Sequence, residues 1–185
     1  MTSDNSPLDV VQIGKGRNLV LLYSLLSDRT AFDRIAPRLA AERRVWLVNL
    51  PGFGASAPAG PGLEQMADRI AEQLPKLGLS SDADLLGNGF GGFISVELAV
   101  RHGDLFDRLV LAQFDRRAEL GTIRNPTLVV VGLRDTATPP ALSYELATGI
   151  PGAALVELPQ CGHSPHIQDP EGFWQAIKPF LQLAG

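Results

Sequence analysis

An aspartate, a histidine and a glycine-rich turn are spaced along this chain so that they could act together in catalysis. Asp135 lies in the polar segment 133–140, and His163 lies in a second such segment, 159–166. A histidine that is oriented by a carboxylate can serve as a general base near neutral pH. The turn, Gly87-Asn88-Gly89-Phe90-Gly91-Gly92, precedes both segments. These residue types predict nucleophilic or general-base chemistry if the fold brings them together.

The glycine-rich turn supports two interpretations. In the first, Gly87, Gly89 and Gly92 form the G-x-G-x-x-G pattern of a phosphate-binding loop, and Asp115 is the acidic residue expected about 20 positions further on. In the second, the turn is a nucleophile elbow, G-x-S-x-G, in which Gly89 takes the place of serine. Small residues two positions before and after the nucleophile let strand and helix pack closely, and Gly87 and Gly91 fit those positions. The motif alone is consistent with both.

The elements around these segments alternate between short apolar runs and helical patterns, which is typical of βαβ units around a parallel sheet. Apolar runs and periodicity predict strands at residues 10–13, 18–23, 45–49, 83–86, 108–112, 127–132 and 154–158. They predict helices at residues 30–40, 63–77, 90–101, 140–147 and 170–183. We therefore expect one α/β domain over residues 1–185, an open and mostly parallel sheet with helices on both faces.

In this arrangement the glycine-rich turn, Asp135 and His163 each follow a predicted strand. Ligands of open parallel sheets bind beyond the carboxyl ends of the strands, so the three segments should share one edge. The order of turn, acid and histidine is that of α/β-hydrolase triads. A dinucleotide fold gives no reason for Asp135 and His163 to be there, and its glycine loop would normally follow the first strand. The elbow interpretation is therefore favoured.

With these motifs in place, the chain resembles the α/β-hydrolase family along nearly its whole length. Within the family it is similar to the enol-lactonases and meta-cleavage-product C–C hydrolases. The segments that carry the resemblance are 21–26, 49–56, 87–92, 132–140 and 161–173. The resemblance implies that His163 is the base, that Asp135 is its partner, and that the backbone amides of Phe90 and Leu25 form the oxyanion hole.

Three departures from the family pattern affect function. Gly89 stands where the family has its nucleophilic serine. Tyr23-Ser24 occupies a place where many members have His-Gly or His-Ser. Relatives usually insert a helical cap of tens of residues after the strand at 108–112, whereas only residues 113–126 separate that strand from the next one here. We therefore expect a capless hydrolase fold.

Other side chains are weaker candidates for the missing nucleophile. Ser95 follows Gly89 by six positions along a predicted helix and should point elsewhere. Ser24 lies near the mouth of the site, but it belongs to the strand that supplies an oxyanion amide, and we interpret it as a structural hydroxyl. Cys161 is interpreted as a bystander, and His166 as a less suitable base than His163.

The resemblance implies an ester, lactone or C–C hydrolase whose hydrolysis is impaired or absent. Removing the serine of such a triad costs on the order of 10⁶ in kcat. One alternative is an enzyme that uses only the His163–Asp135 dyad. Another is a non-catalytic module that binds a small molecule or a protein. Whether the chain is an enzyme stays open at this point.

The amino-acid composition argues against some classes of binding partner. The net charge of −4 and the absence of a basic patch argue against nucleic acid and anionic membranes. The sequence shows no signal pattern and no apolar run of the roughly 20 residues that span a bilayer. The single cysteine, Cys161, fits a reducing compartment, so we expect a cytoplasmic protein.

The expected ligand is a small apolar acyl or lactone-like compound, because apolar side chains surround the predicted cleft. These are Leu25, Leu26, Phe53, Phe90 and Phe114. No cofactor and no metal are expected. Loss of the cap could expose apolar surface that a second copy would cover, so a homodimer is compatible with the sequence.

Overall fold

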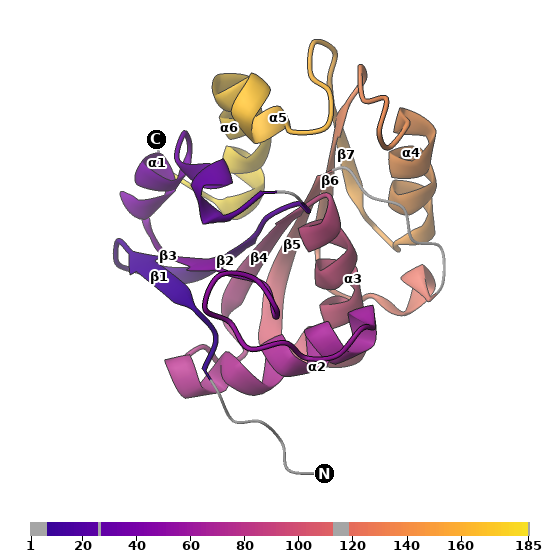
Figure 1. The fold of residues 1–185 in the computed structure, drawn as a ribbon. Coiled ribbons are helices and arrows are strands. Elements are labelled where there is room, and N and C mark those ends of the chain that lie inside the picture. Colours follow the sequence, from indigo (N-terminus) through magenta and orange to yellow (C-terminus); the bar gives the residue numbers. More distant parts are fainter. Residues whose placement is uncertain (1–6, 26, 113–118, 185) are drawn as a thin grey trace.

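A computed structural model of the protein describes residues 7–25, 27–112 and 119–184. Within these residues, seven strands form one sheet in the order β1-β3-β2-β4-β5-β6-β7 (Figure 1). All neighbouring strands are parallel except β1 and β3, which are antiparallel. The strands are β1 (Val10–Ile13), β2 (Arg17–Leu22), β3 (Arg43–Val48), β4 (Ala83–Asn88), β5 (Phe106–Ala112), β6 (Thr127–Gly132) and β7 (Ala154–Leu158). The predicted mostly parallel sheet is confirmed.

Helices cover both faces of the sheet. Figure 1 shows α1 and α6 on one face, and α2, α3 and α4 on the other. The α-helices are α1 (Ala36–Ala40), α2 (Leu63–Gln73), α3 (Phe90–His102), α4 (Pro140–Gly149), α5 (Pro165–Gln168) and α6 (Pro170–Leu181). Short 3-10 helices are η1 (Arg29–Phe32), η2 (Pro75–Leu77), η3 (Gly103–Leu105) and η4 (Leu120–Thr122). None of the helices in the described residues is both long and apolar enough to cross a membrane.

Two predicted helices are interrupted at proline, and a third, predicted over 170–183, ends at Leu181. The helix expected over residues 30–40 is split into η1 and α1, with Pro37 in the first turn of α1. The helix expected over 63–77 ends as α2 at Gln73, and Pro75 begins the 3-10 turn η2. Proline lacks an N–H and is favoured in the first turn of a helix, so Pro37 and Pro75 each lie at the start of a new segment, although α6 accommodates Pro179 in its interior.

The central strands are buried on both faces, as expected of parallel strands between two helical layers. Every residue of β4 and of β6 is buried. One buried residue of β4 is charged: Asp84 is fully buried at the amino end of the strand, among Arg17, Arg43 and Arg108. The opposite, carboxyl ends of β2, β4, β6 and β7 carry the segments singled out by the sequence.

Candidate active site

The glycine-rich turn forms a sharp strand-to-helix elbow between β4 and α3. Gly89 has φ 51° and ψ −119°, a backbone conformation that side-chain-bearing residues rarely adopt. Its N–H donates to the carbonyl of Ala112 at 2.8 Å, which extends the pairing of β4 with β5 by one residue. The structure therefore has the geometry of the predicted elbow.

The glycines on either side of Gly89 are required by close packing. A Cβ added at Gly91 would overlap the carbonyl oxygen of Leu22 on β2. A Cβ added at Gly87 would overlap the Ser95 hydroxyl and lie 2.6 Å from the Gly91 carbonyl oxygen. Strand–helix contact thus accounts for these glycines without a bound phosphate. Asp115, the acid of the phosphate-loop interpretation, lies outside the described residues.

His163 and Asp135 meet beside the elbow, although 28 residues separate them in sequence. The His163 Nδ1 lies 3.0 Å from Asp135 Oδ2. Thr138, which the sequence analysis missed, donates its hydroxyl to the same carboxylate oxygen and lies 3.1 Å from Nδ1. The backbone amides of Ala137 and Thr138 donate to Asp135 Oδ1 at 2.8 and 3.1 Å. An acid that accepts amides two and three residues ahead is a recurrent turn pattern, which could have identified Thr138 in the sequence.

These contacts keep Asp135 ionised. Burial acts to raise the pKa of this carboxyl, but hydrogen bonds from Thr138, His163 and Ala137 outweigh it, so the pKa lies below its usual 3.8. A carboxylate facing Nδ1 places the imidazole proton on that nitrogen. The lone pair of the neutral ring is then on Nε2. This is the tautomer that a general base requires.

The Nε2 atom of His163 faces Ser24 and Gly89. The Ser24 hydroxyl oxygen lies 3.5 Å from Nε2. A Cβ added at Gly89 would overlap that hydroxyl oxygen and lie 2.8 Å from Nε2. Ser24 was expected near the mouth of the site with a structural role. It lies there, against the base and in the space that a side chain at residue 89 would need.

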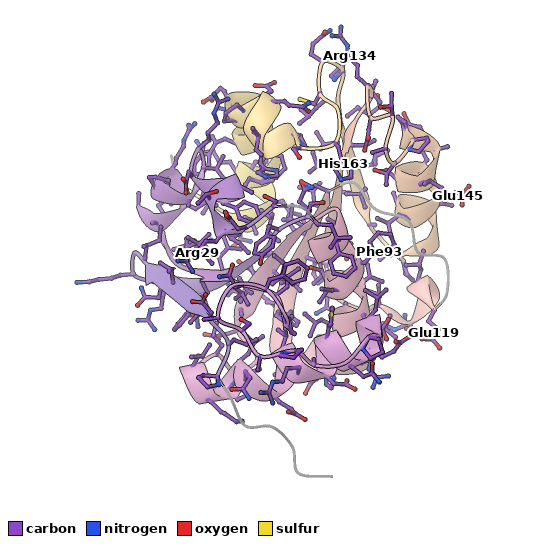
Figure 2. The ribbon with its side chains drawn as sticks, in the orientation of Figure 1. Arg29, Phe93, Glu119, Arg134, Glu145 and His163 are labelled. Atoms are coloured by element: carbon purple, nitrogen blue, oxygen red, sulfur yellow. The ribbon has the colours of Figure 1, made fainter. Side chains whose placement is uncertain are left out.

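A cavity of about 340 Å³ opens between these groups. It is lined by Ser24, Leu25, Gly89, Phe90, Phe93, Thr138 and His163. Figure 2 shows His163 near the carboxyl end of the sheet, with Phe93 on the neighbouring helix α3. Phe90 begins α3, so its amide has no acceptor within the helix, and Leu25 follows Ser24. The cavity is thus lined by four of the five predicted site residues. The fifth, Asp135, is buried on the other side of the His163 ring, at Nδ1.

The aromatic lining of the cavity differs from the expected one. Phe93, one helical turn after Phe90, lines the cavity and was missed. Phe53 lies instead against Tyr23, with ring centroids 6.4 Å apart, and lines a neighbouring hollow. Leu26 and Phe114 lie outside the described residues.

The remaining candidates for catalysis face away from the cavity. The Ser95 hydroxyl donates to the Gly91 carbonyl at 2.7 Å, and the residue is fully buried, which confirms that it points elsewhere. Cys161 is buried, and burial raises the pKa of its thiol, so it is not a thiolate nucleophile. The His166 ring packs between Phe32 and Phe173 at 4.9 and 5.9 Å, away from Asp135.

Asn88 is a further site residue that the sequence did not suggest. Its side-chain amide donates to the His163 carbonyl at 3.2 Å, and it is fully buried. It therefore joins the elbow to the loop that carries the base.

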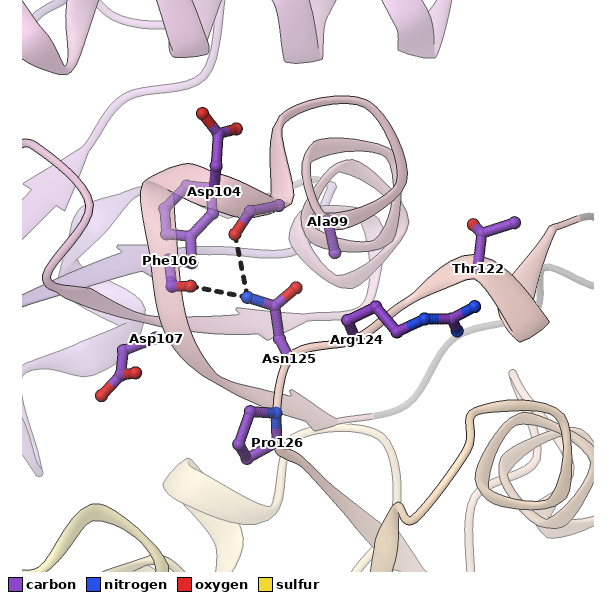
Figure 3. Close-up of a pocket in the computed structure, with 9 residues that line it drawn as sticks. Ala99, Asp104, Phe106, Asp107, Thr122, Arg124, Asn125 and Pro126 are labelled. Atoms are coloured by element: carbon purple, nitrogen blue, oxygen red, sulfur yellow. Dashed lines mark hydrogen bonds between the residues drawn. The ribbon is translucent and has the colours of Figure 1, made fainter.

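A larger cavity, of about 420 Å³, lies at the opposite, amino ends of β5 and β6 (Figure 3). Asn125 is one of the residues that line it, and its side-chain amide donates to the carbonyls of Gly103 and Phe106 at 2.9 and 2.6 Å. It holds no pair of base and nucleophile, so the smaller cavity at the elbow is the candidate active site. Across the described residues, no three His, Cys, Asp or Glu side chains gather as a metal site would require.

Comparison with protein families gives a match to the alpha/beta hydrolase fold over residues 17–113 and 103–170. Similar proteins include the pimeloyl-[acyl-carrier protein] methyl ester esterase of Aeromonas hydrophila, 35% identical over 106 residues, which are 56% of this chain and 40% of that protein. The chain thus spans less than half the length of that relative. The esterase of the same name from Aromatoleum aromaticum is 23% identical over 239 residues, covering 83% of this chain and 94% of that protein. That alignment is longer than the 185-residue chain, so this relative carries residues that have no counterpart here.

Solved structures give the same picture of the fold. The enol-lactonase from Burkholderia xenovorans superposes with a TM-score of 0.87 at 23% identity, covering 95% of this chain and 96% of that one. A meta-cleavage product hydrolase from Pseudomonas fluorescens superposes with a TM-score of 0.88 at 17% identity, covering 96% and 95%. Both neighbours come from the branches that the sequence resembles. At these identities the likeness shows the fold alone.

Proposed function

This chain belongs to the alpha/beta hydrolase fold family, and from that premise we propose that it binds a small carboxylic ester or lactone at the elbow cavity and hydrolyses it slowly, with His163 as the general base. The observation that carries the proposal is the 3.0 Å contact between His163 Nδ1 and Asp135 Oδ2, which leaves Nε2 facing the cavity. A histidine in this setting accepts a proton from an attacking hydroxyl, and its carboxylate partner stabilises the imidazolium that forms.

Gly89 limits the rate. In the family's chemistry the elbow residue attacks the acyl carbon, and a glycine has no group that can do so. General-base catalysis alone contributes about 10²–10⁴-fold, far below the 10⁶ or so that a complete triad adds. The proposed activity is therefore weak in comparison with a hydrolase that has serine at this position.

The backbone amides of Leu25 and Phe90 are the proposed donors to the oxyanion. Phe90 occupies the first position of α3, where a free N–H and the positive end of the helix dipole both favour a negative charge. Donors placed where charge develops in the transition state stabilise it more than the ground state. An ester bound with its carbonyl oxygen at these amides would present its carbonyl carbon to Ser24, Gly89 and His163.

The side chains that line the cavity favour a substrate with an apolar acyl group. Leu25, Phe90 and Phe93 surround the polar atoms of Ser24, Thr138 and His163. The curated relatives are named for the hydrolysis of a methyl ester, which supports carboxylic esters as the substrate class. Residues 113–126 leave little chain for a cap between β5 and β6, so we propose an open cleft for small substrates. The cytoplasmic location and the homodimer stay predictions.

The test is hydrolysis of p-nitrophenyl acetate and butyrate, with background hydrolysis subtracted. We expect a weak rate that falls by about 100-fold in His163→Ala and by a similar factor in Asp135→Asn. His102→Ala is the matched control, because His102 pairs with Asp68 away from the cavity and its loss should leave the rate unchanged. Equal rates in the protein and in His163→Ala would overturn the proposal and favour a non-catalytic binding role.

A further inference from the structure

We propose that Ser24 is the nucleophile of this site, so that the attacking hydroxyl comes from the loop after β2 and not from the elbow. The inference rests on the proposed function, because it uses His163 as the base. It assigns to this chain a triad of Ser24, His163 and Asp135, in which the first member comes from a different strand end than in the family pattern.

The first observation is the distance between hydroxyl and base. The Ser24 Oγ is 3.5 Å from His163 Nε2, and it lines the same cavity as the proposed oxyanion amides. Contacts between nucleophile and base are often longer than an ordinary hydrogen bond before a substrate binds. The other hydroxyl in the cavity belongs to Thr138, which donates to Asp135 on the Nδ1 side of the ring. Ser24 is therefore the cavity hydroxyl placed to give its proton to Nε2.

The second observation is the relationship between Ser24 and Gly89. A Cβ at residue 89 would overlap the Ser24 hydroxyl oxygen. A side chain at the elbow and the Ser24 hydroxyl in its present position therefore exclude each other. The absence of a side chain at Gly89 is what lets the Ser24 hydroxyl reach the position beside the base.

The sheet register explains why these two residues meet. Leu22 on β2 pairs with Gly87 on β4, and Ser24 and Gly89 each follow two residues later. The intervening Tyr23 is buried, and its hydroxyl accepts a hydrogen bond from the Leu50 N–H at 3.2 Å. Ser24 is thus held on an anchored segment and not on a free loop.

The proposed reaction follows acyl-enzyme chemistry. The Ser24 Oγ forms a bond to the ester carbonyl carbon, its proton passes to His163 Nε2, and the carbonyl electron pair moves onto oxygen to form the oxyanion. Collapse of this intermediate breaks the bond to the leaving alcohol, which takes the proton from Nε2. Water then attacks the Ser24 ester and gives a proton to Nε2. Collapse releases the carboxylic acid and returns the proton to Ser24 Oγ.

The experiment is covalent labelling with a fluorophosphonate probe, followed by mass spectrometry of the peptide that contains Ser24. An activated serine displaces fluoride from phosphorus, so we expect one probe per chain, located on Ser24. Labelling should disappear in Ser24→Ala and in His163→Ala. The control Ser27→Ala removes a half-buried hydroxyl three residues away, which donates to the Asp28 carbonyl, and should label as the unchanged protein does.

Hydrolysis of p-nitrophenyl acetate by the same variants completes the test. We expect Ser24→Ala to lose at least about 100-fold of the His163-dependent rate. A protein that hydrolyses the ester with dependence on His163, but neither labels at Ser24 nor loses activity in Ser24→Ala, would overturn the nucleophile assignment and leave the proposed function intact. A protein whose weak rate does not depend on His163 would overturn both. Thermal unfolding followed by circular dichroism verifies that each variant is folded.

Discussion

The Ser24 hydroxyl lies where the first side-chain atom of residue 89 would be, and 3.5 Å from His163 Nε2. The glycine at the elbow therefore cannot be treated as a serine that has simply lost its side chain. Ser24, which follows β2, occupies the space beside Gly89 that a side chain there would take. A serine at residue 89 would require the Ser24 hydroxyl to leave its present position.

Gly89→Ser alone is expected not to install a working nucleophile. The new side chain would collide with the Ser24 hydroxyl and displace it or His163, so kcat/KM for p-nitrophenyl butyrate should stay level or fall. The double variant Gly89→Ser/Ser24→Gly removes the collision. Since it completes a triad at the elbow, its kcat/KM should exceed that of Gly89→Ser by at least about 100-fold.

Two further variants control this comparison. His163→Ala added to the double variant should abolish the gain, because the new serine needs the same base. Gly89→Ala introduces the Cβ without a hydroxyl, so it should lower the activity of the protein. A full gain from Gly89→Ser alone would contradict the steric argument.

Thr138 is expected to position the base. Its hydroxyl donates to Asp135 Oδ2 and lies 3.1 Å from His163 Nδ1. A hydrogen bond to a charged group contributes about 1.5–3 kcal/mol, so Thr138→Val should lower kcat about 10- to 100-fold while KM changes little. Thr138→Ser keeps the hydroxyl and should keep most of the rate.

Thr136→Val serves as the matched control for Thr138→Val. Thr136 is exposed on the same loop, and its replacement should leave kcat unchanged. Steady-state kinetics on p-nitrophenyl butyrate measure all three variants. An unchanged kcat in Thr138→Val would show that Asp135 alone orients His163.

The sequence predicted the sheet well because its strands are continuous apolar runs. The bounds of β1 and β6 agree residue for residue with the predicted 10–13 and 127–132. β4 is two residues longer than predicted, because Gly87 and Asn88 look like a turn in sequence but pair with Leu111 and Ala112. The pairing partner, which is not visible in a local pattern, decides the end of this strand.

The site was predictable where it depends on strand ends and not where it depends on side-by-side packing. Asp135 and His163 each follow a strand, and parallel strands bring such residues to one edge. The role of Ser24 depends on β2 lying directly beside β4 in a fixed register, although β3 and α2 separate them in sequence. The apolar pattern predicts that both strands exist, but not which residues of one face which residues of the other.

The buried charge cluster at the amino ends of the strands is expected to be essential for stability. Asp84 is fully buried and ion-paired to Arg17 at 3.2 Å and Arg108 at 3.6 Å. Burial raises the pKa of Asp84, although the three surrounding arginines oppose the rise. Asp84→Asn would leave Arg17 and Arg108, and the nearby Arg43, without this charge. Removing one member of such a buried set costs about 3–5 kcal/mol.

Asp107→Asn is the matched control for Asp84→Asn. Asp107 contacts the same Arg17 but its side chain is 47% exposed, so its loss should change the free energy of unfolding by less than about 1 kcal/mol. Urea unfolding of the two variants and the unchanged protein measures both values. Equal effects in the two variants would contradict the importance of burial here.

Acid should destabilise the protein through His166, which is buried between Phe32 and Phe173. Neither of its ring nitrogens has a hydrogen-bond partner among the described residues. Burial, and to a lesser extent the charge of His163, lowers the pKa of His166 from 6.5 to about 4. Between pH 6.5 and pH 4, His166 is therefore protonated in the unfolded chain but neutral in the folded chain. Stability is therefore fully present above pH 6.5 and is lost as the pH falls toward 4, by about 3 kcal/mol.

Urea unfolding at pH 7, 6, 5 and 4.5 measures this loss, and His166→Leu isolates it. The leucine variant cannot take up the proton. Its unfolding free energy should therefore fall less than that of the unchanged protein as the pH is lowered. His102→Gln, which removes a histidine that is paired with Asp68, should follow the unchanged protein over this range. If His166→Leu loses stability as steeply as the unchanged protein, the acid sensitivity comes from other groups. In that case His166 must be able to accept a proton in the folded core.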